Sequence, residues 1–323
     1  MPWLLRFVAS ITLLCSLLPE CCAAAKPLSI RTRLSLRLQA ELAEIERDYR
    51  LVVYLDSWLF PRQRPGSYRI QGLQAKLADL EHFLPVFIEE WRLLPTMLVH
   101  RTKLKYIVFG RQFRLPVERI EREAIPDYHH EGMYYSVAFN HTDPVYEHYF
   151  RGVVHHEFFH YVDFRDDGMV YGDDVWKKLN PPGFKYGNGG ISARGNMQGI
   201  VRQSKPGFIT EYATSGVEED KAEVFRCMLV NIVEMEARAR DDVYLTMKVK
   251  QMKKLLTEFC PELDEPYWAS LRVLQRSRLT SPGYEDTWAK QHPVLELPQT
   301  ALEMPLCCEN RRGRRGIGII GRR

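Results

Sequence analysis

The stretch His156-Glu157-Phe158-Phe159-His160 decides how this sequence is interpreted. It follows the pattern H-E-x-x-H. Positions four apart on a helix lie on one face, one turn from each other, so the two imidazoles can bind one metal ion at about 2.0–2.1 Å. Glu157 lies beside such a metal, where its carboxylate can take a proton from metal-bound water. Chance alone gives this string in about 2 of 100 chains of this length; the alternative is an amphipathic helix whose histidines are only hydrogen-bonded.

The flanking residues place the motif deep in a helix. Residues 133–139 are rich in β-branched and aromatic side chains and predict a strand. Asp143 is a typical N-cap and Pro144 suits the first helical position. The helix is expected to run to about Asp163. We also expect the preceding strand to offer an edge on which an extended peptide could lie.

Hydrophobic periodicity predicts helices over much of the remaining chain. A short β-rich run at 104–109 predicts a further strand. Residues 165–210 are rich in Asp, Gly, Asn and Pro and predict a long loop. The expected class is α+β, with a small mixed sheet and a mainly helical C-terminal part. The other expected helices are 31–50, 72–92 with a kink or break at Pro85, one from 219 onward, 242–258 and 266–278.

A second acidic segment follows the loop and can complete the site. Glu219, Ala222 and Glu223 fall on one helical face. The small Ala222 would let two helices approach closely, Glu219 could bind the metal, and Glu223 could hydrogen-bond a ligand imidazole. Glu218 is an alternative ligand, and the whole run could instead be a solvated acidic helix start. Asp163 could orient an imidazole or be solvated.

Three segments together resemble a known family. These are residues 156–163, the triplet Glu211-Tyr212-Ala213, and residues 219–225. The arrangement resembles the gluzincin metallopeptidases, and is closest to bacterial zinc-binding metallopeptidases and to the catalytic domain of anthrax lethal factor. The resemblance covers about residues 130–235. Phe159 stands where the lethal-factor form has glycine, at a variable position.

The resemblance implies a role for each motif residue. In the family pattern a tyrosine lies seven residues before the ligating glutamate, and Tyr212 and Glu219 reproduce that spacing. The implied zinc ligands are His156, His160 and Glu219. Glu157 would be the general base and Tyr212 the donor to the oxyanion.

The implied fold is zincin-like, and the implied function is a zinc-dependent endopeptidase acting on peptides or proteins. One alternative is a secreted module that binds a protein or a surface and whose zinc is structural. Another is a binder of membranes or nucleic acids that uses the basic C-terminal segment.

The two ends of the chain suggest a division into three parts. Arg6, the apolar run 7–18 and small residues at 23–25 predict a signal peptide over residues 1–25, and hence a secreted or periplasmic protein. An uncleaved membrane anchor is the alternative. The metallopeptidase domain is expected at 26–290, with an N-terminal helical portion at 26–100. Residues 291–323 are expected to form a basic, disordered tail.

Composition limits the possible partners. Removing the six arginines of 311–323 from the net charge of +4 leaves −2 for residues 26–310, because Arg6 and Glu20 cancel. No nucleic-acid partner is therefore expected, and no membrane span after signal cleavage. Cys227, Cys260, Cys307 and Cys308 would remain, and the sequence leaves their pairing open.

Overall fold

The computed structural model describes residues 28–57, 60–61, 70–115, 120–138, 144–168, 171–190 and 205–274. The predicted signal peptide, the basic tail, Cys307 and Cys308 lie outside these residues. The helices are η1 (Ile30–Arg33), α1 (Leu36–Tyr49), α2 (Leu77–Trp91), α3 (Thr96–Thr102), α4 (Pro144–Asp166), α5 (Asp174–Lys177), η4 (Tyr212–Thr214), α6 (Val217–Val230), α7 (Ile232–Asp241), α8 (Val243–Phe259) and α9 (Glu265–Arg272). The strands are β1 (Val52–Tyr54), β2 (Gln71–Leu73), β3 (Tyr106–Arg114), β4 (Ala124–Asp127) and β5 (Gly132–Ser136).

The five strands form one mixed sheet in the order β1-β3-β5-β4, with β2 paired to the far end of β3. Strands β1, β3 and β5 are parallel, whereas β4 runs antiparallel to β5 and β2 antiparallel to β3. The described part of the chain is therefore α+β, with a small mixed sheet and a mainly helical C-terminal part, as the sequence predicts.

Strand β3 is buried on both faces of the sheet. Ile107 and Phe109 point into the main core, where the Phe109 ring meets Phe83 of α2 edge-on at 5.7 Å. Tyr106 and Val108 belong to a second apolar cluster on the opposite face. Alternate strand residues point to opposite faces, so the nearly continuous apolar run of β3 is explained by a covered sheet.

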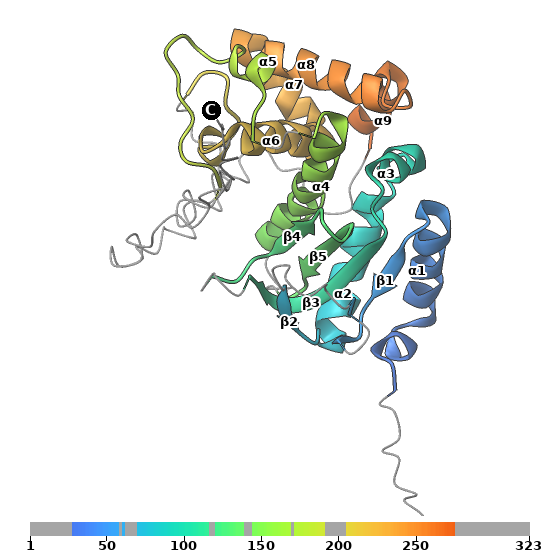
Figure 1. The fold of residues 1–323 in the computed structure, drawn as a ribbon. Coiled ribbons are helices and arrows are strands. Elements are labelled where there is room, and N and C mark those ends of the chain that lie inside the picture. The colour runs from blue at the N-terminus through green and yellow to red at the C-terminus, as the bar shows by residue number, and fades with distance from the viewer. Residues whose placement is uncertain are drawn as a thin grey trace, which may run out of the picture.

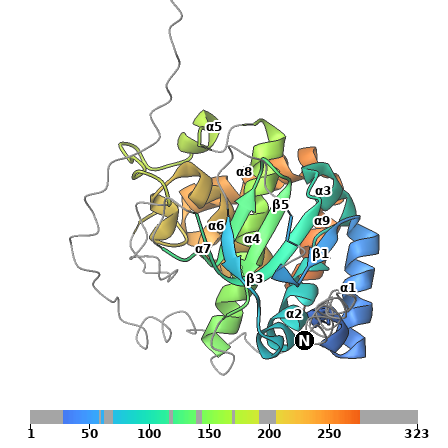
Figure 2. The same cartoon turned by 60° about the horizontal axis from the view of Figure 1, so that its bottom comes forward.

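Helix α4 connects the two halves of the molecule. It packs against α2 and β4 on one side and against α6 on the other. Figure 1 shows α6–α9 above the sheet and α1–α3, with α4 between them, and Figure 2 shows α6 and α7 on one side of α4 and α1 and α3 on the other. The main core runs without a break from η1 to α9. Residues on α4 are therefore held rigidly against both halves.

The structure corrects the expected role of the strand after which α4 begins. This strand is β5, and it lies between β3 and β4, so it offers no free edge to a peptide. The edge strand beside β5 is β4, which contains Pro126 and was not predicted as a strand. An edge strand tolerates proline because one row of its backbone groups has no partner strand.

Three other expectations differ from the structure. Strand β3 was expected to end at Gly110, but it continues because its last residues pair with β2. Strand β2 itself lies at the start of the segment 72–92, where a helix was expected. Pro85 lies inside α2 without splitting it. The N-terminal portion, expected to be helical, also contributes β1 and β2. No disulfide joins Cys227 to Cys260.

Within the described ranges, no helix combines the length and the apolar character that crossing a membrane requires.

Candidate metal site

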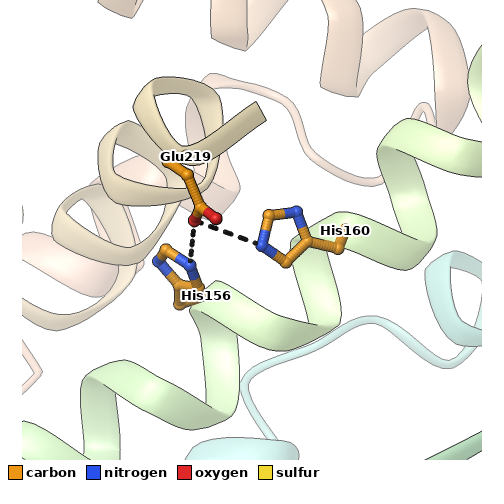
Figure 3. Close-up of side chains that lie close together, drawn as sticks. All are labelled: His156, His160 and Glu219. Atoms are coloured by element: carbon orange, nitrogen blue, oxygen red, sulfur yellow. Dashed lines mark hydrogen bonds and ion pairs between the residues drawn. The ribbon is translucent and has the colours of Figure 1, made fainter. Parts of the chain in front are cut away.

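The two histidines of the motif meet one carboxylate from a second helix. His156 and His160 lie one turn apart on α4, with ring centroids 5.0 Å apart. Glu219 comes from the first turn of α6. Its Oε2 lies 3.0 Å from Nε2 of His156 and 3.6 Å from Nε2 of His160 (Figure 3). All three residues are buried, with exposed fractions of 7%, 7% and 8%.

This arrangement fits a metal ion. One ligand atom from each residue lies within 4.8 Å of the others, and in the described part of the chain this is the one group of its kind. The second ring nitrogen of His156, Nδ1, lies 2.8 Å from Oε1 of Glu223, one turn further along α6. That contact, expected from the spacing on α6, orients the imidazole so that Nε2 points to Glu219. Two histidines and a carboxylate are a common ligand set of catalytic zinc.

The charges of the site also favour a cation. Burial opposes a charge on His156, but its contacts with Glu219 and Glu223 outweigh burial and raise its pKa to about 10. Burial likewise opposes the charge on Glu219, but the two imidazoles outweigh it and hold its pKa well below the usual value. The carboxylates of Glu219 and Glu223 are therefore negatively charged although they are buried. A buried negative charge is stabilised by a positive partner, and a divalent cation can be that partner.

Glu157 and Tyr212 adjoin the three candidate ligands. Burial raises the pKa of Glu157, and the neighbouring charges of His156 and His160 act against this. The ring of Tyr212 lies 5.9 Å from that of His156. Burial and the hydrogen bond of its hydroxyl to Glu219 raise the pKa of Tyr212 far above its usual value. The Tyr212 hydroxyl therefore keeps its proton and can donate it in a hydrogen bond.

Three other expectations at the site are corrected. Asp163 is buried and forms an ion pair with Lys221 of α6, so it does not face solvent. Its Oδ2 and the Nδ1 atom of His160 each have no hydrogen-bond partner among the described residues, so Asp163 does not orient that imidazole. Glu218 is not in the ligand group, because the chain trace of α6 brings Glu219 to the histidines. The acidic start of α6 is not a solvated helix end either, since Glu218, Glu219, Asp220 and Lys221 are all buried.

Sequence reasoning missed the partners of these buried charges. Asp220 Oδ2 accepts hydrogen bonds from Trp176 Nε1 at 2.8 Å and from Tyr186 at 2.5 Å, and pairs with Lys248 of α8 at 2.7 Å. The run of four charged residues was visible in the sequence. The sequence did not show that this run is buried, because its burial depends on packing against α8 and against the segment after α4.

Comparison with known proteins found one family model and one similar solved structure. Residues 130–258 match a family model described as "Putative zinc-binding metallo-peptidase". The matched range includes α4, α6 and all the candidate ligands. Among solved structures, the chain is similar to "a putative zinc-binding metallo-peptidase from Bacteroides caccae ATCC 43185", with 13% identity and a TM-score of 0.43 over 75% of this chain and 96% of that one. A comparison with curated proteins found no match.

Proposed function

We propose that this protein is a zinc-dependent endopeptidase of the gluzincin type with a zincin-like catalytic domain. The observation that carries the proposal is the meeting of His156, His160 and Glu219 in one buried group from two crossing helices. Glu157 and Tyr212 adjoin the group, which a purely structural zinc site would not need. The family match of residues 130–258 supports a metallopeptidase in general.

Each residue has a distinct task in peptide hydrolysis. His156, His160 and Glu219 would hold the zinc ion, and Glu223 would keep the His156 ring in place. A zinc ion held there would supply Lewis-acid chemistry: it would make a water molecule more acidic and polarise a carbonyl group. Glu157 takes the proton of the attacking water and later passes it to the leaving amine. The Tyr212 hydroxyl donates a hydrogen bond to the oxyanion that develops on the scissile carbonyl.

The substrate would be a peptide or a protein. The N-terminal 25 residues have the composition of a secretory signal, so we place the enzyme in the periplasm or outside the cell. The same proposal assigns residues 26–290 to the catalytic domain.

The substitution Glu157→Gln tests this function. It keeps the size of the side chain but removes the base, so peptide cleavage should fall by about 10²–10⁴-fold while zinc content, measured by elemental analysis, stays at the wild-type level. Asp174→Asn is a matched control, because the Asp174 side chain is 88% exposed. Proteolysis of a peptide library by Glu157→Gln at the wild-type rate would exclude the proposal. A wild-type protein that binds zinc but cleaves no peptide would favour a structural zinc module.

A further inference from the structure

The segment from Asp173 to Gly190 is attached to the start of α6 at successive points. Asp173 Oδ2 lies 3.0 Å from Nζ of Lys221. Further along, Trp176 and Tyr186 both donate hydrogen bonds to Asp220. The Trp176 side chain is fully buried. These contacts use neighbours of Glu219 on α6, so the segment and the candidate ligand share one support.

The end of this segment lies against the loop that carries Tyr212. Gly187 donates its backbone N–H to the carbonyl of Thr214 at 3.0 Å, and Gly189 donates to the carbonyl of Ser215 at 2.7 Å. The backbone N–H of Gly190 donates to the Glu218 carboxylate. Three hydrogen bonds therefore hold the backbone of residues 187–190 against the stretch that runs from η4 to the first turn of α6.

Gly190 is buried and directly adjoins the candidate site. A Cβ atom at this position would lie 1.9 Å from Oε1 of Glu219 and 2.4 Å from the hydroxyl oxygen of Tyr212. Cβ contacts under 3.0 Å essentially never occur, so a side chain here would displace the Glu219 carboxylate or the Tyr212 ring. Glycine is the residue that leaves both in place.

We infer that the segment Asp173–Gly190 is a fixed wall of the metal site, and that Gly190 is a positioning residue that sets the orientation of Glu219 and Tyr212. The wall is not a displaceable cover, because a buried tryptophan and the buried charges of Asp220 and Lys221 hold it. The inference rests on the proposed role of Glu219 as a zinc ligand. It adds that the zinc affinity depends on a segment that contributes no ligand.

The substitution Gly190→Ala tests the wall. We expect zinc affinity, measured by competition with a chromogenic chelator, to fall at least tenfold, and peptide cleavage to fall with it. Gly172→Ala is the matched control on the same connection, since a Cβ atom at Gly172 meets nothing within 4 Å. Its zinc affinity should stay within about twofold of wild type, the usual size of a surface change.

A second variant separates positioning from misfolding. Tyr186→Phe removes only the hydroxyl bound to Asp220 and leaves Gly190 unchanged. We expect a smaller loss of zinc affinity, about two- to tenfold, because part of the free energy of one charged hydrogen bond is transmitted to the site. Melting of the metal-free proteins shows whether each variant is folded. Wild-type zinc affinity in both folded variants would overturn the inference.

Coupling between the wall and the metal must be reciprocal. Zinc should therefore slow the cleavage of wild-type protein by trypsin at Lys185, an exposed residue of the wall, relative to the metal-free protein, and Gly190→Ala should reduce this protection. Equal cleavage at Lys185 with and without zinc would also overturn the inference. These readouts do not use peptidase activity, so a wild-type protein that binds zinc without cleaving peptides would refute the proposed function and leave the wall intact.

Discussion

At the scale of single residues, the carboxylate of Glu219 contacts several neighbours at once. Its Oε2 approaches both histidines of α4. Its Oε1 faces Gly190, and the carboxylate accepts a hydrogen bond from the Tyr212 hydroxyl. Both oxygens are thus engaged in a buried place, where a carboxylate is stable only with partners for its charge.

Tyr212→Phe should lower the turnover number for peptide cleavage by about 10²–10³-fold, the usual effect of losing one oxyanion donor. The reason is that the protonated hydroxyl is lost while the ring remains. Zinc content should be unchanged, as measured by elemental analysis. Tyr267→Phe is the control, because that hydroxyl donates to the carbonyl of Leu93, between α2 and α3. Full activity of Tyr212→Phe would show that Tyr212 has no part in catalysis.

At the scale of the elements, α4 is held by buried charges on the side facing α2. Arg151 Nη1 lies 2.6 Å from Oε1 of Glu90, and His155 Nε2 lies 2.7 Å from the other oxygen of Glu90. A further carboxylate on α4, that of Glu147, lies 2.8 Å from Nη2 of Arg151. These contacts fix the rotation of α4, so the face with His156 turns toward α6 and not toward α2.

Arg151→Met should lower the free energy of unfolding by about 3–5 kcal/mol, because it leaves Glu90 buried without its main counter-charge. Urea denaturation of the metal-free protein measures the change. Arg37→Met is the matched control. Arg37 pairs with Glu41 on α1, but its side chain is 81% exposed, so the loss should stay below about 0.5 kcal/mol. Equal losses in the two variants would contradict the assigned role of Arg151.

At the scale of the whole molecule, the candidate ligands come from two helices separated by a long connection. His160 on α4 and Glu219 on α6 are brought together only when α4 packs on the sheet and α6 packs on α4. The unfolded chain contains no preformed site of this kind. Metal binding is therefore coupled to folding.

Zinc should raise the melting temperature. At a free concentration of 100 times its Kd, zinc adds about 2.7 kcal/mol to the free energy of unfolding, which corresponds to about 5–10 °C for a domain of this size. A chelator should reverse the shift. Glu219→Gln should lose most of it, whereas Asp174→Asn should keep it. A melting temperature that does not respond to zinc would contradict metal binding at this site.

Local spacing in the sequence was enough to predict part of the fold and of the site. It predicted the helix that carries His156 and His160, the second helix with Glu219 and Glu223, and the contact of Glu223 with an imidazole, because residues three or four apart share a helical face. The same reasoning predicted these helices together with strands at 104–109 and 133–139, which indicates the α+β class. The roles of Glu157, Tyr212 and the three candidate ligands remain predictions.

The contacts between distant segments, in contrast, depend on how the whole chain packs. It placed β5 inside the sheet, paired Asp163 with Lys221, and brought Gly190 against Glu219. None of these contacts has a signature in the local sequence, because each joins residues from different elements whose approach is set by the packing of the core. A glycine in a loop looks like an ordinary turn residue until the fold shows what lies beside it.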